Sequence, residues 1–482
     1  MMRDPRHPGL YLGGRWSDRA ARLPVDDPAT GEVIGSVPAA GTDDVDAAVG
    51  TARAAFDRWA ATDPAERAAV LDRFADAMTA RETELAHTVT AEMGAPRDFS
   101  LRVQVRLAVD VLRAQAALAR TFPFEEAIPD GPPARVVREA AGVVAAITPW
   151  NYPLYQIAAK VGPALAAGCP VVLKPSGVAP LNAFLLAACA DDAGLPPGLL
   201  SVVSGTGRVV GEALAAHPGV DMVSFTGSTG AGQHVMRTAA GTVKRVALEL
   251  GGKSAAVALP DADLAAAVEA TVAAAFANTG QTCTALTRLL VPAGRYDEAV
   301  AAAVRAGGRY TVGDPAQPGT HLGPSASAAQ RDTVADYIRL GVKEGARVVV
   351  GGPETPDGIP AGLAGGHWVR PTVLADAEPG MRVVREEIFG PVLCLLRYED
   401  EETALRLAND SDFGLSGAVW SADPDRATAF ARRMRTGRVE INGGAFNLNA
   451  PTGGYKQSGL GRELGRWGLE EFCETKTLQG VR

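Results

Sequence analysis

Residues 222–232 read MVSFTGSTGAG, an apolar β-branched run followed by a glycine-rich turn and the start of a helical stretch. This pattern is typical of a strand that passes into a helix, and it repeats along the chain. We expect strands at residues 143–147, 171–174, 200–204, 222–226 and 243–250, and helices at residues 157–167, 181–192, 208–217 and 230–239. Because these strands are apolar almost throughout, the pattern predicts a parallel sheet covered by helices on both faces.

A second alternating series follows the first. Strands are expected at residues 288–291, 347–350, 392–396, 416–420 and 438–441, and helices at residues 296–306, 326–344, 402–409 and 426–434. Asp261 and Asp263 are candidate N-caps for an alanine-rich helix that runs to about Thr279. Residues 352–366, rich in proline and glycine, predict a surface loop. The chain is therefore expected to form two α/β domains.

Two segments fit neither domain. In residues 121–139, Asp130-Gly131 lies between two extended stretches and predicts a long hairpin, and residues 472–479 also have an extended pattern. Strands without a core of their own need an edge to pair with, and another subunit is one source of that edge. Two local surface hairpins explain the same pattern, so the residues alone leave the alternatives open.

Composition excludes several classes of function. The 482 residues include 47 Lys and Arg against 55 Asp and Glu, a formal net charge of −8 without a basic run, so nucleic-acid binding is not expected. No stretch reaches the roughly 18–20 apolar residues of a membrane helix, and residues 1–5 lack the apolar centre of a signal peptide. The five cysteines form no C-x-x-C pair and the six histidines no H-x-x-x-H pair. We expect a cytoplasmic protein without a metal site.

Cys283 is the candidate nucleophile. It follows the small polar residues 278–282 and precedes a predicted strand, and loops between rigid elements are common sites of chemistry. Cys169, Cys189 and Cys394 lie in apolar runs, which predicts buried structural thiols. Cys473 lies among glutamates, whose negative charge opposes formation of a thiolate.

Glu249 is the candidate base, because a carboxylate at the end of an apolar strand must be paired, protonated or functional. An ion-paired or helix-capping carboxylate is the alternative. Residues 252–254 resemble the end of a phosphate-binding loop, but the first glycine of that motif would fall at Ala247, inside the strand, so this interpretation fails. Glycine clusters at 227–232 and 205–211 occupy two strand–helix junctions, and together they favour a dinucleotide site at the carboxyl ends of the strands.

Seven motifs, in order, resemble the aldehyde dehydrogenase superfamily over nearly the whole chain. They are TPWN at 148–151, KPS at 174–176, FTGS at 225–228, ELGGK at 249–253, GQTC at 280–283, EEIFGP at 386–391 and GGYKQSG at 453–459. The resemblance implies a Rossmann-like NAD(P)-binding domain (residues 1–119 and 140–251), a catalytic domain (252–457) and a small β oligomerisation arm with the C-terminal segment (120–139 and 458–482). A homodimer or homotetramer is then expected.

The resemblance also implies the chemistry, which is oxidation of an aldehyde to a carboxylic acid with NAD(P). Cys283 would attack the carbonyl, while the Asn151 amide and the Cys283 N–H hold the oxyanion. After hydride transfer to the nicotinamide, Glu249 would activate the water that hydrolyses the thioester, which favours hydrolysis over transfer to coenzyme A. A coenzyme A-acylating or reductive relative, and a catalytically silent cofactor-binding protein, are the alternatives.

Further residues take their roles from the same resemblance. It implies that the cofactor is bound by Lys174, Ser176, Trp150, Gly227, Ser228, Glu387 and Phe389. It implies a substrate pocket of Tyr152, Tyr155, Thr282, Leu448 and Thr452. It implies a proton relay of Lys160 and Glu463. A core aromatic explains Trp150 equally well, and a surface ion pair explains Lys160 and Glu463 equally well.

Gly177 is a departure that bears on the cofactor. Many NAD-preferring relatives have an acidic residue three positions beyond the lysine, where it binds the ribose hydroxyls and repels a 2′-phosphate, whereas this chain has Gly177. We therefore expect NAD as the main cofactor with NADP accepted. No arginine stands out as a clamp for a carboxylate, so uncharged aliphatic or aromatic aldehydes are expected over semialdehydes.

Overall fold

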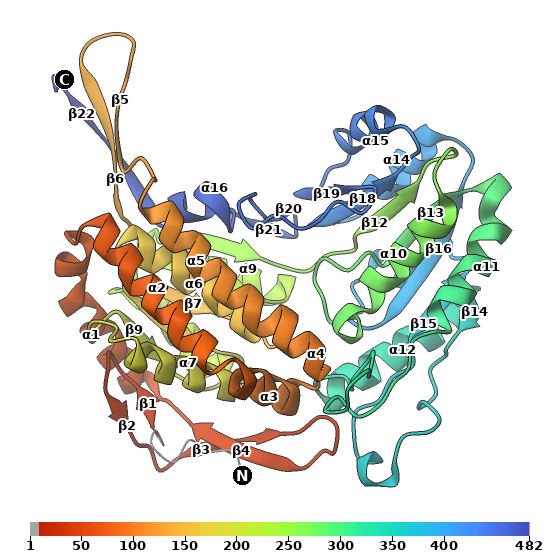
Figure 1. Cartoon of the computed structure of the whole chain (residues 1–482), viewed down its shortest axis with the longest axis horizontal. Coiled ribbons are helices and arrows are strands. Elements are labelled where there is room, and N and C mark those ends of the chain that lie inside the picture. The colour runs from red at the N-terminus through yellow and green to blue at the C-terminus, as the bar shows by residue number, and fades with distance from the viewer. Residues whose placement is uncertain (1–8, 482) are drawn as a thin grey trace.

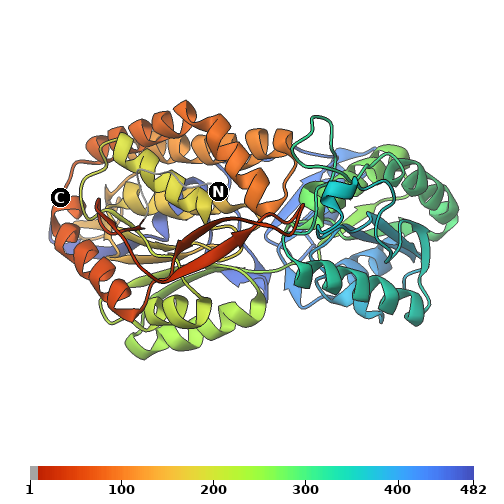
Figure 2. The same cartoon turned by 90° about the horizontal axis from the view of Figure 1, so that it is seen from below.

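The structure, a computed structural model, describes residues 9–481, so the expectation about a signal peptide at residues 1–5 lies outside the described residues. The chain forms two lobes, and a narrow arm projects from the lobe that contains the N-terminal half (Figures 1 and 2). One lobe is built on an eight-stranded sheet and the other on a seven-stranded sheet, both mostly parallel. The predicted α/β fold with two sheets is confirmed.

The first sheet has the strand order β2-β1-β9-β8-β7-β10-β11-β21. Its strands are β1 (Leu10–Tyr11), β2 (Trp16–Ser17), β7 (Val144–Ile147), β8 (Val171–Lys174), β9 (Leu200–Val202), β10 (Met222–Thr226), β11 (Arg245–Glu249) and β21 (Gly459–Leu460). Side chains alternate along β7: Val144 and Ala146 pack into one core cluster, and Ala145 and Ile147 into another. The sheet is therefore covered on both faces, as its apolar strands predicted.

Helices of the N-terminal half form these two layers (Figure 2). One layer consists of α2 (Pro64–Ala80), α3 (Glu82–Met93), α5 (Arg106–Ala119), α6 (Pro153–Ala167) and α7 (Leu181–Asp192), and the other of α1 (Thr42–Ala60), α8 (Glu212–Ala216) and α9 (Thr229–Ala239). The helix expected at residues 208–217 begins instead as a π-helical turn, η2 (Gly207–Gly211). Its two glycines disfavour regular helix by about 1 kcal/mol each relative to alanine.

The second sheet has the order β14-β15-β16-β13-β12-β18-β19. Its strands are β12 (Ala255–Ala258), β13 (Arg288–Pro292), β14 (Arg347–Val350), β15 (Thr372–Ala375), β16 (Val392–Tyr398), β18 (Ser416–Trp420) and β19 (Arg438–Ile441). Its helices are α10 (Leu264–Phe276), α11 (Tyr296–Gly307), α12 (Ala328–Glu344), α13 (Arg382–Arg385), α14 (Glu401–Asn409) and α15 (Pro424–Ala431). Strands β12 and β15 were not predicted, because each is a short run that reads equally well as loop.

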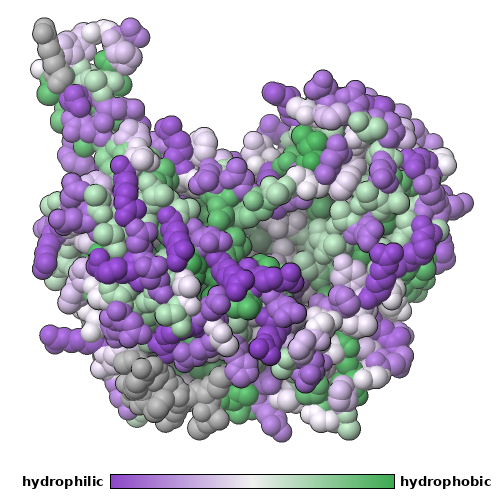
Figure 3. Space-filling view, in the orientation of Figure 1, coloured by the Kyte–Doolittle hydropathy of each residue, from purple (hydrophilic) through white to green (hydrophobic). Residues whose placement is uncertain are grey.

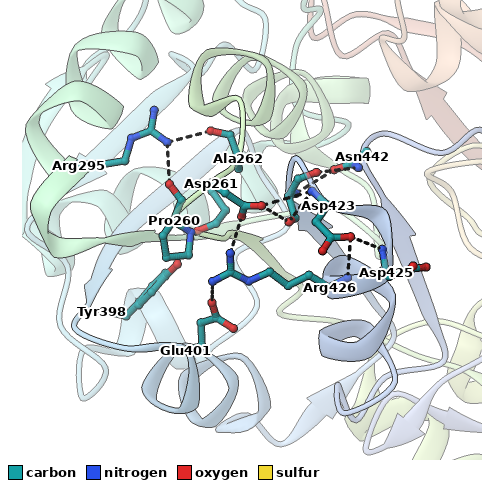
Figure 4. Close-up of polar contacts among 12 residues, drawn as sticks. Pro260, Asp261, Ala262, Arg295, Tyr398, Glu401, Asp423, Asp425, Arg426 and Asn442 are labelled. Atoms are coloured by element: carbon teal, nitrogen blue, oxygen red, sulfur yellow. Dashed lines mark hydrogen bonds and ion pairs between the residues drawn. The ribbon is translucent and has the colours of Figure 1, made fainter.

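The two candidate N-caps before α10 have different partners, and Figure 4 shows those of Asp261. Asp263 accepts a hydrogen bond from the Ala266 N–H at 3.1 Å and caps the helix. Asp261 instead accepts from the Ser421 hydroxyl at 2.7 Å and pairs with Arg426, so its expected capping role is wrong. The helix also ends before Thr279, because the backbone at residues 278 and 279 takes positive φ angles of 55° and 56°.

The arm is a three-stranded antiparallel sheet in the order β22-β6-β5 (Figure 1). Its strands are β5 (Glu125–Ala127), β6 (Ala134–Ala140) and β22 (Cys473–Gln479). The predicted hairpin around Asp130-Gly131 is confirmed as β5 and β6, and the C-terminal strand pairs with β6 along its whole length. Beyond Cys473, β22 is exposed, so the arm has no core of its own.

Short elements complete the part of the chain that is described. They are β3 (Arg22–Asp26), β4 (Val33–Pro38), α4 (Arg97–Phe99), the π-helical η1 (Ser100–Val105), the 3-10 turns η3 (Ala240–Thr242), η4 (Ala277–Gly280), η5 (Ala293–Arg295) and η6 (Ala361–Leu363), β17 (Phe413–Gly414), β20 (Tyr455–Lys456) and α16 (Gly465–Glu470). The predicted loop at 352–366 contains only the short turn η6. Among residues 9–481, no helix has the length and apolar character needed to cross a bilayer.

Candidate active site

The site lies where the two sheets approach each other, and Figure 3 shows apolar residues on the walls of the hollow between the lobes. Glu249 is the last residue of β11, in the first sheet, whereas Cys283 and Glu387 precede β13 and β16 of the second. Glycines allow the contact. A Cβ at Gly251 would lie 2.1 Å from Glu387 Oε2, and one at Gly252 would lie 2.5 Å from the Cys283 carbonyl oxygen. The carboxyl ends of one sheet therefore meet the loops that enter the other.

The loop before Cys283 is held firmly. Gly280 has a φ of +70° and packs directly on the backbone of Gly390, where no Cβ would fit. The Gln281 side chain donates to the Asn278 carbonyl at 3.1 Å and accepts from the Ala326 N–H at 2.8 Å. Cys283 is partly exposed, whereas Cys169, Cys189, Cys394 and Cys473 are buried. Burial of the first three of these is what their apolar neighbours predicted.

Asn151, which follows β7, is buried beside this loop. Its Nδ2 donates to the Gln281 carbonyl at 2.9 Å. The backbone carbonyl oxygen of Asn151 accepts hydrogen bonds from Gln104 Nε2 and Asn278 Nδ2, both at 2.9 Å. The amide group is thus fixed against the Cys283 loop, and its second hydrogen has no acceptor among the described residues, so it remains available to an oxyanion.

Glu249 is half-buried, and its Oε1 is enclosed without a protein partner in the described part of the chain. This oxygen faces Gly453, whose Cβ, if present, would lie 3.0 Å away. Burial and the neighbouring Glu463 raise the pKa of Glu249 well above its usual value, while Lys160 and Arg462 oppose that rise. The structure thus differs from the ion-paired or capping alternative, and such a group accepts protons readily once ionised.

Lys160 and Glu463 form a buried ion pair, not the surface pair that the sequence allowed. Lys160 is fully buried in α6, and its Nζ also donates to the Thr226 hydroxyl at 2.7 Å. Thr226 in turn donates to Gln156 Oε1 at 3.1 Å. Because Glu463 acts on the pKa of Glu249, the pair is electrostatically linked to the candidate base.

Cys283 carries its proton at neutral pH in this environment. Burial raises the pKa of its thiol to about 12, and the carboxyl groups of Glu249 and Glu387 add to the effect. Arg438 is the group that opposes it. A thiolate therefore forms only when a base removes the proton or when positive charge arrives beside the sulfur.

A cavity of about 520 Å³ opens at the carboxyl ends of β7, β8 and β10. Its polar lining includes Lys174, Ser176, Arg208, Glu212 and His234. Burial lowers the pKa of Lys174 to about 8, and its Nζ donates to the Pro175 carbonyl at 2.8 Å. Beside the cavity, Ser228 is the N-cap of α9, and its hydroxyl accepts from the Ala231 N–H at 3.4 Å. A strand-end cavity with a helix N-terminus suits a dinucleotide.

The remaining predicted cofactor residues lie nearer to Cys283. Glu387 Oε1 accepts from the Gly252 N–H at 2.9 Å, and burial raises the pKa of its carboxyl to about 7. The rings of Trp150 and Phe389 meet edge to face with centroids 5.4 Å apart. Trp150 is thus more than a core aromatic of the first lobe, because it contacts a residue of the second.

Three of the five predicted pocket residues, Tyr152, Tyr155 and Thr282, contact one another. The Tyr152 and Thr282 hydroxyls are 2.7 Å apart, and the Tyr152 and Tyr155 rings meet edge to face at 6.4 Å. Leu448 packs, like Tyr155, against the core of the first lobe. Thr452 is placed differently, since its backbone N–H donates to the Glu463 carbonyl at 2.8 Å and joins it to the relay pair.

Sequence reasoning missed several residues of this site. The π-helical turn η1 brings Gln104 to the Asn151 carbonyl, and Phe99 packs edge to face on Tyr152 at 5.9 Å. Asn278 holds the same carbonyl from the other side. Arg438 was missed too, although its charge reaches Cys283. A glutamine or arginine in an otherwise amphipathic stretch carries no signal of such contacts.

Fold and site together define an α/β enzyme with a dinucleotide-type cavity in one lobe and, where the two lobes meet, a partly exposed thiol and a half-buried carboxyl group. The chain belongs to the aldehyde dehydrogenase family, whose sequence model matches residues 16–478. It is an NAD(P)-dependent aldehyde dehydrogenase by this membership and by its relatives.

Relatives of known name cover almost the entire chain. It is 47% identical to 3-succinoylsemialdehyde-pyridine dehydrogenase of a Pseudomonas species over 482 residues, which cover 99% of each chain. It is 47% identical to geranial dehydrogenase of Castellaniella defragrans over 478 residues, 98% of each chain. A crystal structure of a mutant of aldehyde dehydrogenase C from Pseudomonas syringae, with NAD+ and octanal, is 46% identical with a TM-score of 0.96, covering 99% of this chain and 98% of the other.

Proposed function

We propose that this enzyme oxidises an uncharged aldehyde to the free carboxylic acid with NAD, through a thioester on Cys283. The observation that carries the proposal is the enclosed, unpartnered Oε1 of the half-buried Glu249, whose charge acts on the partly exposed Cys283 thiol. A thiol alone would stop at the thioester, whereas a base beside it makes hydrolysis possible.

The residues present fit the cofactor. Lys174 is desolvated at the strand ends, a Cβ at Gly177 would meet nothing within 4 Å, and Ser228 caps the helix whose first N–H groups suit a phosphate. Lys174, Ser176, Gly227 and Ser228 would hold the adenosine and pyrophosphate, and Glu387, Phe389 and Trp150 the nicotinamide half. When bound, NAD supplies the hydride acceptor and places positive charge near the site. The relative from Pseudomonas syringae supports this choice, because its structure contains NAD+.

In the first half-reaction the Cys283 sulfur attacks the aldehyde carbon. Desolvation and two nearby carboxyl groups hold the thiol proton, and the positive charge that bound NAD would add favours its loss. The oxyanion then accepts hydrogen bonds from the free Nδ2 hydrogen of Asn151 and from the Cys283 N–H. Loss of one such donor typically costs about 10²–10³ in rate.

In the second half-reaction Glu249 removes a proton from the water that attacks the thioester. Its proton must then leave the buried site before the next turnover. Lys160 and Glu463, whose charges act on Glu249, form the route we propose for that proton. Glu463 accepts from the ammonium group directly, so a proton moves along the pair without a large change in net charge.

NADP is proposed as a second, poorer cofactor. Gly177 offers no carboxylate to repel a 2′-phosphate, and Arg208 lines the same cavity with a positive charge. Glu212, also in the lining, opposes this and favours NAD. A kcat/KM ratio for NAD over NADP above about 10³ would rule out acceptance, since it corresponds to roughly 4 kcal/mol of discrimination.

Two further expectations belong to this proposal. The arm exposes strands β22 and β5 at its edges without a core beneath them, which supports assembly into a homodimer or homotetramer. All five cysteines are free, which supports a cytoplasmic location. Light scattering of the purified enzyme tests the first, and a monomer at micromolar concentration would contradict it.

Product analysis tests the central proposal. Purified enzyme is incubated with hexanal or benzaldehyde and NAD, with and without coenzyme A. We expect the free acid and stoichiometric NADH in both cases. An acyl-coenzyme A product would identify the acylating alternative, and cofactor binding without any turnover of a broad aldehyde panel would identify the silent one.

A further inference from the structure

Arg438 is a cation at the substrate side of the active site that the mechanism above does not use. It is the first residue of β19, and the preceding Gly437 abuts Gly453, since a Cβ there would lie 1.6 Å from the Gly453 carbonyl oxygen. Gly453 in turn faces Glu249 Oε1. The strand that carries Arg438 is therefore one backbone contact away from the candidate base.

The Arg438 side chain is held by its neighbours. Its guanidinium lies over the ring of Phe446, 5.1 Å from the centroid, in the loop that also carries the pocket residue Leu448. Its Nη2 donates to Glu440 Oε1 at 3.0 Å. Its charge opposes the rise in the pKa values of Cys283, in the second lobe, and Tyr155, in the first. The guanidinium thus lies within electrostatic reach of both the nucleophile and the pocket.

Two of the three nitrogens of this guanidinium have no acceptor. Nη2 is paired with Glu440, and Nε is buried without a partner, whereas Nη1 has no protein acceptor among residues 9–481 in a side chain that is 26% exposed. A guanidinium N–H without an acceptor gains from any oxygen that reaches it.

We propose that Arg438 is a specificity-determining residue: its free Nη1 binds an uncharged acceptor oxygen, such as a ketone or ester carbonyl, carried by the substrate some carbons away from the aldehyde. The inference rests on the proposed function and names its substrate class. It refines the expectation of a purely apolar aldehyde.

The charge around Arg438 favours a neutral oxygen over a carboxylate. Glu440 already offsets the guanidinium at 3.0 Å. Glu249 and Glu387 also lie near Cys283 and would repel an anionic substrate. A neutral carbonyl gains the hydrogen bond without that repulsion.

The test compares three families of aldehydes of increasing length: methyl ω-oxoalkanoates, alkanals with the same number of chain atoms, and ω-oxoalkanoate anions. For the wild-type enzyme with NAD, we expect kcat/KM of the best ester to exceed that of its matched alkanal by about tenfold, the usual scale for a hydrogen bond to a charged donor. The anions should do no better than the alkanals.

Variants then test whether Arg438 causes the difference in kcat/KM between the ester and the alkanal. R438M should reduce the ester-to-alkanal ratio to near one, and R438K should keep part of it. R432M removes an exposed arginine at the end of α15 and should leave the ratio unchanged. E440Q releases the full charge of Arg438 and should raise kcat/KM for the anions about tenfold. The ratio is the readout because R438M also alters the Cys283 thiol and so affects every aldehyde.

The outcomes separate two failures. If alkanals are oxidised but the ester has no advantage, or R438M leaves that advantage intact, the role of Arg438 is wrong and the proposed function stands. If no aldehyde of the three families is oxidised, the proposed function itself fails. Thermal unfolding of each variant shows whether it has folded. If R438M has not folded, the results for R438K and E440Q decide whether Arg438 has the proposed role.

Discussion

The two sheets present opposite ends to the active site. Glu249 and Lys174 end strands of the first sheet, at the carboxyl edge where ligands of parallel sheets usually lie. Cys283 and Glu387 precede strands of the second sheet, and Arg438 begins one, so that sheet presents its amino edge. Neither lobe therefore holds a complete site. In the proposed mechanism the first lobe supplies the cofactor cavity and the base, and the second supplies the nucleophile.

This division predicts which functions separate on mutation. A change confined to the second lobe should remove chemistry and spare binding in the 520 Å³ cavity. A change at the carboxyl edge of the first should alter either the cofactor or the second half-reaction.

We expect Cys283→Ala to have the largest effect on turnover. We expect turnover to fall at least about 10⁴-fold, because no other thiol at the site is exposed. NAD affinity, measured by calorimetry, should stay within about threefold, since the cavity belongs to the other lobe. Equal loss of NAD binding would mean that the lobes do not divide the work in this way.

Glu249→Gln should separate the two half-reactions. Removing the base leaves the thioester without an activated water, so steady-state turnover is expected to fall on the order of 10³-fold. A rapid-quench experiment should show a burst of NADH close to one per site, and intact mass spectrometry should show the acylated enzyme. A variant that lost the burst as well would indicate that Glu249 is needed first to deprotonate Cys283.

Gly177→Glu changes only the lining of the proposed cofactor cavity. A carboxylate there should repel the 2′-phosphate and lower kcat/KM for NADP by about 10², while kcat/KM for NAD changes by less than about threefold. Gly177→Gln, of the same size without charge, is the matched control. If both variants lose NADP activity equally, bulk and not charge sets the preference.

The smallest effect concerns stability and its pH dependence. Burial raises the pKa of Glu249 in the folded state, so the folded protein binds this proton more tightly than the unfolded chain does. That contribution is present at low pH and is lost as pH rises through the folded pKa. The Glu249→Gln variant has no carboxyl group at this position, so it does not lose this stability as pH rises. Its melting temperature should therefore exceed that of the wild type by a margin that grows from about pH 5 to pH 9, and a constant margin would contradict the raised pKa.

Local sequence patterns predicted an element correctly where its own residues are enough to determine its conformation. Strand β8 has its predicted bounds because an apolar run lies between Pro170 and Pro175. The hairpin of the arm followed from Asp130-Gly131, a turn that needs little beyond its own residues. In contrast, β12 and β15 are short runs whose neighbours in the sheet decide their conformation.

Candidate site residues divide in the same way. Cys283 and Glu249 stand out in the sequence because a polar residue after an apolar strand or helix is locally unusual. Gln104 and Asn278 do not, since their contacts with Asn151 span 47 and 127 residues of chain. The division of the chain into domains at residues 119, 139, 251 and 457 stays a prediction, as do the catalytic and binding roles.

By itself, the sequence determined the two α/β series, the arm hairpin and the membership signalled by seven motifs, because periodicity, turn chemistry and short motifs are local properties. Only the tertiary structure decided that Asp263 and not Asp261 caps α10, that Lys160 and Glu463 pair in the interior, and that Glu249 Oε1 is enclosed without a partner. Those outcomes depend on desolvation and on contacts between distant segments, and both arise only once the two sheets are packed against each other.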